Sequence, residues 1–326
     1  MKKQSISILG STGSIGLNSL NIVNHKKNLL KINLLSANKN FKKICNQIIK
    51  FRPKIFVINN QKVYKKIKMK FKNNSKIKIL NNFDKLNEIR NSDITIAAIP
   101  GIAGLNPTIT MLKKSKKMLI ANKESIICGW PLINKIAVKN KTKIVPVDSE
   151  HFSIMKLLER ENLDNIKKVY ITASGGPFLN YSFSNLKKAK PSQAIKHPKW
   201  KMGKKISIDS ATLMNKMLEL VEAQKLFSIS NEKLAVIVHP ESLVHAIIEL
   251  KNGLYKFIYH ETSMIIPLAN AIFEDQLEIK DFLNKNKKSI KNNKFKNLTF
   301  MKVDKKRFPI INLKNRINEH ISTPTI

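Results

Sequence analysis

Short apolar runs recur along the first 147 residues, and stretches with helical character separate them. The runs are rich in β-branched residues and occupy positions 6–9, 32–37, 55–58, 77–80, 94–99, 118–121 and 144–147. Runs of this length and composition are typical of buried strands. Because strands that alternate with helices form a parallel sheet with helices on both faces, the pattern predicts a doubly wound α/β domain.

The pattern changes after residue 147. Strand-like runs at 169–173, 234–238, 244–250 and 254–259 alternate less regularly with helices, as in α+β domains. A chain of 326 residues is also long enough for two domains, each with its own core. We therefore predict an α/β fold, with an N-terminal Rossmann-like doubly wound domain at 1–147, an α+β domain at 148–304 and a linker at 305–326.

The first apolar run leads directly into a glycine-spaced turn. Gly10, Gly13 and Gly16 follow the spacing G-x-x-G-x-x-G, a variant of the dinucleotide fingerprint, and the stretch from Ser14 to His25 is predicted to form the next helix. Such glycines let backbone N–H groups approach a pyrophosphate at the positive end of the helix. The glycine motif alone is weak evidence, but the strand before it and the helix and strand after it are those of a dinucleotide-binding domain.

The end of the second apolar run indicates which nicotinamide dinucleotide binds. Enzymes that use NAD usually place Asp or Glu there to hold the ribose 2′-hydroxyl, whereas this chain reads Ala37-Asn38-Lys39-Asn40. Because a lysine suits a 2′-phosphate, the sequence favours NADPH over NADH. The alternative is that Lys39 is simply one of the many lysines of this chain.

Two carboxylates one residue apart, Asp148 and Glu150, precede a further acidic position, Glu219, on a predicted helix. Hard divalent ions such as Mg²⁺ and Mn²⁺ prefer several carboxylate oxygens. We expect Asp148 and Glu150 to point to the same side of an extended strand. Asn215 and Lys216 share a helical face with Glu219. The pattern indicates a metal site beside an anion site; the alternative is a surface ion pair and a solvated acidic turn.

Three loops carry further candidate ligands. Lys123 and Glu124 follow a strand at the carboxyl edge of the predicted sheet, where open α/β sheets bind ligands. The Ser-Gly-Gly-Pro-Phe turn that begins at Ser174 offers a hydroxyl and backbone N–H groups to an anion. The segment that begins at His197 and contains Trp200 suits a mobile lid, which brings a cation or donor and a water-excluding ring over a ligand. Each feature alone would also suit an ordinary turn or a packing residue.

The formal net charge of +38 invites a nucleic-acid interpretation. Nearly all of the positive charge is lysine, because guanidinium groups come only from Arg52, Arg90, Arg160, Arg307 and Arg316. Proteins that read bases rely on arginine and on aromatic stacking platforms, and neither is concentrated here. A lysine bias along the whole chain explains the charge, so we expect no specific nucleic-acid partner.

Cysteine usage and hydropathy place the chain in the cytoplasm. Cys45 and Cys128 match no metal or disulfide spacing, which fits a reducing cytosol. The apolar run near the N-terminus is short and broken by Gly10, so no signal peptide is expected. No apolar stretch approaches the length of a membrane span, and we expect no membrane partner.

Six motifs closely resemble, in this order, those of the 1-deoxy-D-xylulose 5-phosphate reductoisomerase family. They are Gly10 to Gly16 (GSTGSIG), Ala121 to Ser125 (ANKES), Pro146 to His151 (PVDSEH), Ser174 to Phe178 (SGGPF), His197 to Gly203 (HPKWKMG) and Ile208 to Glu219 (IDSATLMNKMLE). The resemblance runs from the N-terminus to about residue 270. It agrees with the metal, anion and dinucleotide sites inferred from the residues themselves.

The resemblance implies the second step of the non-mevalonate isoprenoid pathway. In that step 1-deoxy-D-xylulose 5-phosphate is rearranged and then reduced by NADPH to 2-C-methyl-D-erythritol 4-phosphate, with Mg²⁺, Mn²⁺ or Co²⁺ required. It also implies that the domain at 148–304 is the catalytic domain, that the substrate is a small phosphorylated molecule, and that the protein is a homodimer.

The resemblance also implies a set of site residues. Asp148, Glu150 and Glu219 match the metal ligands and, with Lys123, form the expected catalytic set. Expected at the substrate are Lys123, Ser149, Glu150, Ser174, His197, Trp200, Ser210, Asn215, Lys216 and Glu219, of which Ser174, His197, Ser210, Asn215 and Lys216 hold the phosphate. Expected at the cofactor are Ser11, Thr12, Gly13, Ser14, Ile15, Ala37, Asn38, Lys39, Asn40, Asn122, Lys123, Glu124 and Gly203.

The chain departs from the family pattern at four places. The family usually has Gly at the positions of Asn38 and Met217; Asn tolerates a left-handed backbone, whereas Met217 adds bulk. Around Thr262 to Pro267 an expected Asp and Arg are missing. Family chains continue into a C-terminal helical domain, so we interpret 305–326 as a linker toward a domain that is absent, and expect uncovered apolar surface on the catalytic domain.

Two other classes remain as alternatives. A plain NAD(P)-dependent oxidoreductase without an isomerase step would not need a metal site with three carboxylates. A basic, non-catalytic binding protein would need neither a metal nor a dinucleotide. Within the favoured class, an inactive truncated form is the remaining alternative.

Overall fold

The computed structural model describes residues 3–86, 91–200, 203–274, 277–279, 282 and 297–317. The chain forms two compact units. The first comprises Met1–Ser125, Gly129–Val147 and Leu268–Asn284, and the second comprises Ile126–Cys128, Asp148–Pro267 and Lys285–Ile326. The main division falls between Val147 and Asp148. The stretch from Leu268 lies with the first unit, although its position in the sequence predicted that it belongs to the second domain.

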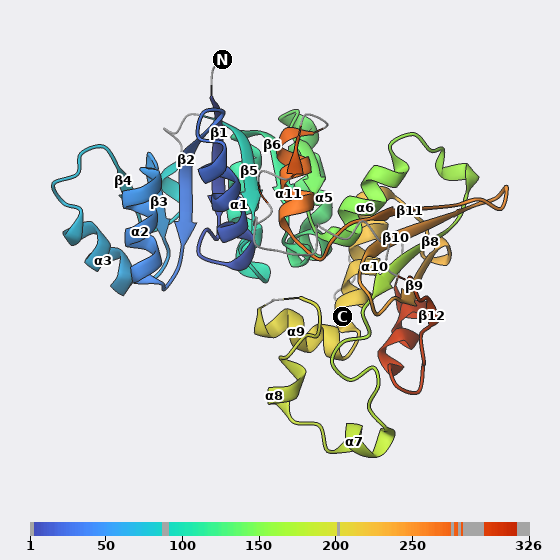
Figure 1. Cartoon of the computed structure of the whole chain (residues 1–326). Helices are drawn as coiled ribbons and strands as arrows, with labels where there is room; N and C mark the ends of the chain where they lie inside the picture. The colour runs from blue at the N-terminus through green and yellow to red at the C-terminus, as the bar shows by residue number, and fades with distance from the viewer. Residues whose placement is uncertain are drawn as a thin grey trace. The chain divides into compact units, whose positions relative to one another are not determined.

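The first unit is a doubly wound α/β domain (Figure 1). Its elements are β1 (Gln4–Leu9), α1 (Ser14–His25), β2 (Leu30–Ala37), α2 (Phe41–Phe51), β3 (Ile55–Ile58), α3 (Gln61–Lys70), β4 (Lys78–Leu80), β5 (Ser92–Ala97), α4 (Leu105–Leu112), β6 (Ser115–Ile120), α5 (Lys123–Lys139), β7 (Lys143–Pro146) and most of α11 (Ile265–Phe273). Every strand pair is parallel, in the order β4-β3-β2-β1-β5-β6-β7. The predicted α/β fold and its strands are confirmed.

The order of the strands determines where this unit can bind a ligand. β1 lies between β2 and β5, so the chain moves outward in one direction from β1 and later returns to its other side. At such a switch point the loops at the carboxyl ends of the strands leave a crevice, which is where open α/β sheets bind ligands. The glycine-rich turn after β1 lies at this point.

The second unit is an α+β domain. Its elements are α6 (Ser149–Leu158), β8 (Ile166–Ala173), α7 (Phe183–Lys187), α8 (Pro191–Ala194), α9 (Lys204–Ala211), α10 (Met214–Phe227), β9 (Leu234–Val238), β10 (Val244–Leu250), β11 (Tyr255–Tyr259), β12 (Met301–Lys302) and the 3₁₀ segment η7 (Pro309–Arg316). The sheet order is β11-β10-β8-β9-β12, and only β8 and β9 are parallel among the described pairs. The predicted mixed architecture is therefore confirmed.

The parallel pair β8 and β9 explains how distant polar residues meet. Parallel neighbours need a long crossover, and here the crossover contains α7 to α10. It begins at Ser174, directly after β8, and its last α-helix is α10, most of which is buried against the sheet. Met217 on α10 is fully buried in the apolar core. Its added bulk, relative to the glycine usual in the family, therefore fills core volume.

The segment from Phe308 to Ile317 packs on the second unit. Phe308 is 2% exposed and lies against Ala173 and Leu213. Ile317 is 5% exposed in the core formed by α10 and the sheet. These residues contribute to the interior of the unit, which a free linker would not do. The rest of the predicted linker, residues 318–326, lies outside the described residues.

Candidate active site

The glycine-rich turn between β1 and α1 is shaped by two close approaches. Gly10 has φ 83°, and a Cβ there would lie 2.6 Å from the carbonyl oxygen of Ala98. A Cβ on Gly16 would collide with the carbonyl oxygen of Gly10, so α1 can lie against the turn only with glycine there. The first turn of α1 contains no acidic residue and no side-chain cap. Its positive end is therefore not neutralised locally and suits a phosphate.

Two of the expected cofactor residues use their side chains to hold loops. The hydroxyl oxygen of Ser11 lies 2.6 Å from Oε1 of the buried Gln47, and Nε2 of Gln47 donates to the carbonyl oxygen of Ser11 at 2.9 Å. Asn122 caps α5 by accepting from the backbone N–H of Ser125 at 2.5 Å, and it donates to the carbonyl of Gly101 at 2.9 Å. These contacts fix the two loops at the switch point.

The other expected cofactor residues lie in the same loops. In the glycine-rich turn Thr12 and Ile15 are half-buried and Gly13 and Ser14 are exposed, whereas beyond the buried Ala37 the residues Asn38, Lys39 and Asn40 are exposed. Asn38 does not use the left-handed backbone, so this position does not require glycine. Lys123 is 7% exposed at the start of α5, beside the half-buried Glu124. Gly203, at the N-cap of α9, belongs to the second unit.

Three carboxylates meet in the second unit. Ligand atoms of Asp148, Glu150 and Glu219 all lie within 4.8 Å of one another. The expected extended strand through Asp148 and Glu150 was wrong, because β7 ends at Pro146 and α6 begins at Ser149. Asp148 is the N-cap of α6 and accepts from the backbone N–H of Glu150 at 3.4 Å. The start of a helix, not the alternation of a strand, brings the two carboxylates together.

Lys216 lies inside this cluster. Its ammonium contacts Oε1 of Glu150 and lies 2.7 Å from Oε2 of Glu219. The amide of Asn215 donates to Oε1 of Glu219, and Ser149 donates its hydroxyl to Oε2 of Glu150 at 2.6 Å. The side chain of Glu219 is only 1% exposed. Residues predicted from helical spacing to share a face do so, in the interior.

Burial and neighbouring charges together shift the pKa values of this cluster. Burial, together with the charges of Glu219 and Asp148, raises the pKa of Glu150 to about 8, although Lys216 opposes the rise. Burial lowers the pKa of Lys216, but the carboxylates of Glu150 and Glu219 outweigh it and raise that pKa overall. One ammonium thus does not satisfy three carboxylates. Carboxylate oxygens in this number fit a hard divalent cation.

A neutral histidine supports the anion site. Nδ1 of His197 accepts the backbone N–H groups of Lys199 at 3.2 Å and Trp200 at 2.9 Å, so its proton resides on Nε2. Nε2–H donates to the hydroxyl oxygen of Ser174 at 2.9 Å, which also accepts from the N–H of Gly176 at 3.1 Å. Burial, with a smaller effect of Lys216, lowers the pKa of His197 to about 4. The hydrogen bonds around the ring therefore place His197 as a donor to Ser174.

The turn after Ser174 lies against the end of α9. Gly176 has φ 67°, and a Cβ there would lie 2.8 Å from the carbonyl oxygen of Ser210. The backbone of Gly176 therefore lies directly against the backbone of Ser210. Between α9 and α10, the buried Leu213 adopts φ 64°, an unfavourable conformation for leucine that sharply redirects the chain into α10.

The expected lid residue Trp200 lies against a buried histidine pair. Its ring contacts His245 edge-on at 5.9 Å, and His245 stacks on His260 at 3.9 Å between centroids. Burial lowers the pKa of His245 well below its usual range. The neighbouring residues 201 and 202 of the expected lid lie outside the described residues.

Sequence reasoning did not assign His151, Glu222 and His245. His151 on α6 is fully buried against α10, with Nε2 2.9 Å from the carbonyl oxygen of Glu219 and Nδ1 3.4 Å from Oε2 of Glu222. It thereby joins the helix that begins at the Asp148 cap to the helix that carries Glu219. The only available signals were that His151 lies inside a motif and that Glu222 lies one turn after Glu219.

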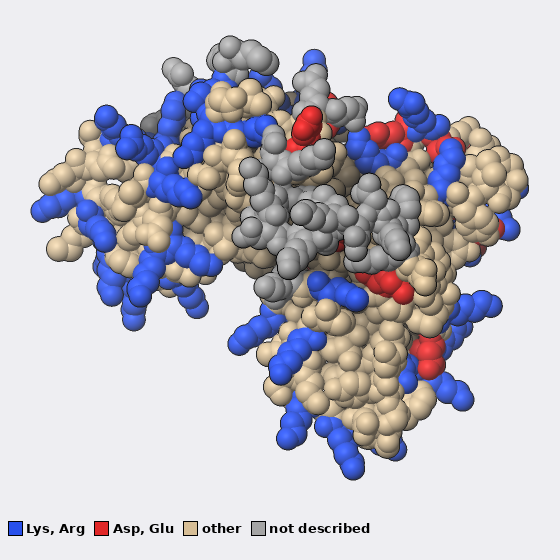
Figure 2. Space-filling view, in the orientation of Figure 1, with Lys and Arg blue, Asp and Glu red and all other residues tan. Residues whose placement is uncertain are grey.

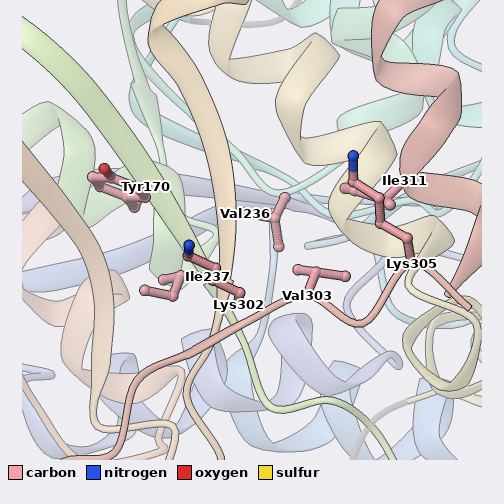
Figure 3. A pocket seen from close by; sticks show the side chains of 7 residues that line it. All are labelled: Tyr170, Val236, Ile237, Lys302, Val303, Lys305 and Ile311. Carbon is pink, nitrogen blue, oxygen red and sulfur yellow. The ribbon is translucent and has the colours of Figure 1, made fainter. Parts of the chain in front are cut away.

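A separate cavity of the second unit contains none of the expected site residues (Figure 3). It has a volume of about 270 Å³ and is lined by Tyr170, Val236, Ile237, Lys302, Val303, Lys305 and Ile311. Its largely aliphatic lining offers no carboxylate to a metal. The carboxylate cluster is therefore the better candidate site.

Charge and hydropathy add two observations. On the face shown in Figure 2, Lys and Arg side chains are spread over both units and do not gather in one stripe. Among the helices that the structure describes, none combines the length and apolar character needed to cross a bilayer.

Comparisons with known proteins show which family this chain resembles. A model described as 1-deoxy-D-xylulose 5-phosphate reductoisomerase matches residues 6–129, and one described as its C-terminal domain matches residues 144–227. The 1-deoxy-D-xylulose 5-phosphate reductoisomerase of Pelagibacter ubique is 45% identical over an alignment of 327 positions, which covers 99% of this chain and 82% of that relative.

Two solved structures are similar over nearly the whole chain. One is a DOX-P reductoisomerase in complex with NADPH, fosmidomycin and magnesium, with 32% identity, a TM-score of 0.84, and coverage of 96% of this chain and 79% of that one. The other is the 1-deoxy-D-xylulose 5-phosphate reductoisomerase from Zymomonas mobilis in complex with NADPH, with 31% identity, a TM-score of 0.81, and coverage of 97% and 81%.

A dinucleotide-type α/β unit followed by a unit with a buried carboxylate cluster defines a class, the metal-dependent oxidoreductases that use a nicotinamide dinucleotide. The sequence identity and the coverage narrow this class to one family. The chain belongs to the 1-deoxy-D-xylulose 5-phosphate reductoisomerase family.

Proposed function

We propose that this chain rearranges 1-deoxy-D-xylulose 5-phosphate and reduces the product with NADPH to 2-C-methyl-D-erythritol 4-phosphate, in the presence of a divalent metal ion. The observation that carries the proposal is the meeting of Asp148, Glu150 and Glu219 in one unit with the Ser174–His197 donor pair. Relatives of the same family with high coverage and a similar structure in complex with NADPH, fosmidomycin and magnesium support it.

The carboxylates are proposed to hold the metal. Asp148, Glu150 and Glu219 supply oxygen ligands that suit Mg²⁺ or Mn²⁺, with Co²⁺ as a third candidate. Such an ion supplies Lewis-acid stabilisation of the charge that develops on oxygen when a carbon–carbon bond next to a ketone breaks and re-forms. His151 holds the backbone of Glu219, so the ligands are positioned before the substrate binds.

The phosphate is proposed to bind beside the carboxylates. The hydroxyl of Ser174 accepts from His197 and Gly176, which directs its own hydrogen toward a ligand. Of the three hydrogens on the ammonium of Lys216, two face Glu150 and Glu219 and the third is available to a phosphate oxygen. Ser210 and Asn215 complete the proposed set, and Ser149 and Lys123 are proposed to contact the substrate's other oxygens.

The proposed second step is hydride transfer from NADPH to the aldehyde formed by the rearrangement, with a proton completing the alcohol. Trp200 and its segment are proposed to exclude water and retain the aldehyde during this interval. A plain oxidoreductase would not need the carboxylate cluster, and a non-catalytic binding protein would need neither cluster nor glycine-rich turn.

We also propose a homodimer that works in the cytosol. β11 is an edge strand of its sheet, and Leu254, Tyr255 and Phe257 expose about half of their surface there. An exposed apolar edge of this kind favours pairing with a second copy. Both cysteines are free thiols, which supports a reducing compartment.

The deciding experiment measures NADPH oxidation by absorbance with purified protein. Oxidation should require both 1-deoxy-D-xylulose 5-phosphate and Mn²⁺, and the product should be 2-C-methyl-D-erythritol 4-phosphate by mass spectrometry. Oxidation without metal would favour the plain oxidoreductase. Dinucleotide binding without turnover would favour the inactive form.

A further inference from the structure

The glycine-rich turn has a lysine beside it that comes from a different element. Nζ of Lys43, in the first turn of α2, lies 3.3 Å from the carbonyl oxygen of Thr12. The backbone N–H of Lys43 donates to Oδ1 of Asn40 at 3.0 Å, which caps the helix and fixes where the side chain starts. An exposed ammonium is thus held between the turn after β1 and the end of β2.

A buried contact fixes the register between this helix and the turn. Gln47 lies one turn after Lys43 and therefore on the same face of α2. It is 4% exposed and makes two hydrogen bonds to Ser11, at 2.6 and 2.9 Å. Buried contacts of the same helix therefore place the backbone of Lys43 beside the glycine-rich turn, within reach of its ammonium.

We propose that Lys43, together with Lys39, binds the 2′-phosphate of NADPH and helps to determine the preference for NADPH over NADH. This inference rests on the proposed use of NADPH. In this class of domain the adenosine ribose lies between the glycine-rich turn and the end of the second strand. The ammonium of Lys43 lies in that interval, and a neutral carbonyl is a much weaker partner for it than a phosphate.

The composition of the second strand's end supports the assignment. Positions 37 to 40 read Ala-Asn-Lys-Asn and contain no carboxylate to hold a 2′-hydroxyl or to repel a 2′-phosphate. Lys39 at this end is exposed, so one lysine alone would bind a solvated phosphate weakly. A second lysine from α2 gives the phosphate two cationic partners from two elements.

The competing role for Lys43 is mechanical. If its ammonium only braces the turn through Thr12, loss of the side chain should weaken every dinucleotide to the same extent, because the pyrophosphate of NADH uses the same turn. If it contacts the 2′-phosphate, only NADPH should lose affinity. The two roles therefore differ in the ratio of two dissociation constants.

The test measures dissociation constants of NADPH and NADH by fluorescence titration for the wild type, Lys43→Gln and Lys43→Arg. Lys42→Gln is the matched control, because it makes the same charge change at the adjacent exposed position of α2. For Lys43→Gln we expect NADPH to bind about tenfold more weakly and NADH to change by less than about twofold. Lys43→Arg should keep most of the preference, and high salt should reduce it.

The assignment of Lys43 would be overturned if Lys43→Gln lost equal affinity for the two dinucleotides. It would also be overturned if Lys42→Gln lost as much affinity for NADPH as Lys43→Gln. A Lys43→Gln protein that keeps the wild-type preference would overturn it too. A wild type that binds neither dinucleotide is a different result, because it would overturn the proposed cofactor itself.

Discussion

Lys216 and Glu219 lie one turn apart on α10, and their Nζ and Oε2 atoms form an ion pair of 2.7 Å in the protein interior. Buried charges are costly unless they are paired and hydrogen-bonded. Here the same ammonium also contacts Glu150. The cluster therefore tolerates one buried and two partly buried carboxylates while keeping their oxygen atoms close enough to chelate a cation.

Glu219→Gln should leave the fold intact and reduce turnover by about 100-fold or more. Gln keeps the shape of the side chain, and Lys216 retains Glu150 as a partner. The substitution removes one of three anionic ligands, a loss expected to exceed the 10- to 100-fold effect typical of groups that only support ligands. Turnover at saturating Mn²⁺ and the circular dichroism spectrum are the measurements. Wild-type turnover would refute the metal assignment.

His197 should remain neutral, with its proton on Nε2, from neutral pH down to about pH 5. Burial, and less strongly Lys216, lowers its pKa to about 4 from a usual 6.5. As the pH falls, His197 in the unfolded chain therefore becomes protonated at a higher pH than His197 in the folded protein. The contribution of His197 to stability is fully present above about pH 6.5 and is lost progressively as the pH falls toward 4.

Two-dimensional ¹H–¹⁵N spectra can check this prediction for His197. The signal is assigned by its disappearance in His197→Asn, and Lys216→Met should raise the pKa because it removes a nearby positive charge. A midpoint near 6.5 that does not respond to Lys216→Met would contradict the hydrogen-bond pattern at Nδ1.

Lys39→Asp should weaken the binding of NADPH by roughly 100-fold and the binding of NADH much less, because it replaces a partner of the phosphate by a repelling charge. Lys31→Asp makes the same charge change at an exposed position near the other end of β2 and serves as the control. The Michaelis constants for both dinucleotides decide the matter. If both rise equally, Lys39 is only a surface residue.

Local patterns in the sequence predicted most of the fold. The bounds of the strands Leu234–Val238 and Val244–Leu250 follow directly from the apolar runs, because a buried strand begins and ends where polar turn residues interrupt the run. Likewise Lys216 and Glu219 are neighbours through helical geometry alone. Features that depend on three or four consecutive residues could therefore be predicted from the sequence.

The parts of the site that were not predicted depend on contacts between distant segments. Asp148 was expected in a strand, because a capping aspartate directly after an apolar run resembles a strand end. The tautomer of His197 depends on its own loop and on Ser174, and the role of His151 depends on the carbonyl of Glu219. Apolar periodicity carries no information about such pairings.

Phe308→Ala should destabilise the second unit by about 3 kcal/mol, the usual cost of removing a buried aromatic ring. Phe308 is 2% exposed and lies against Leu213, whose backbone has φ 64° at the start of α10. The cavity would also loosen the turn that positions Asn215 and Lys216, so affinity for Mn²⁺ should fall with stability.

Phe183→Ala provides the control for Phe308→Ala, because that ring is 51% exposed and contacts only Arg307 among the described ring contacts, at 5.1 Å. Removing the Phe183 ring should lower the free energy of unfolding by about 1 kcal/mol or less. Urea unfolding followed by fluorescence gives both free energies. Equal small costs would mean that the segment from Phe308 behaves as the linker that its sequence indicated. A cost confined to Phe308 would mean that this segment completes the core on which the carboxylate helix rests.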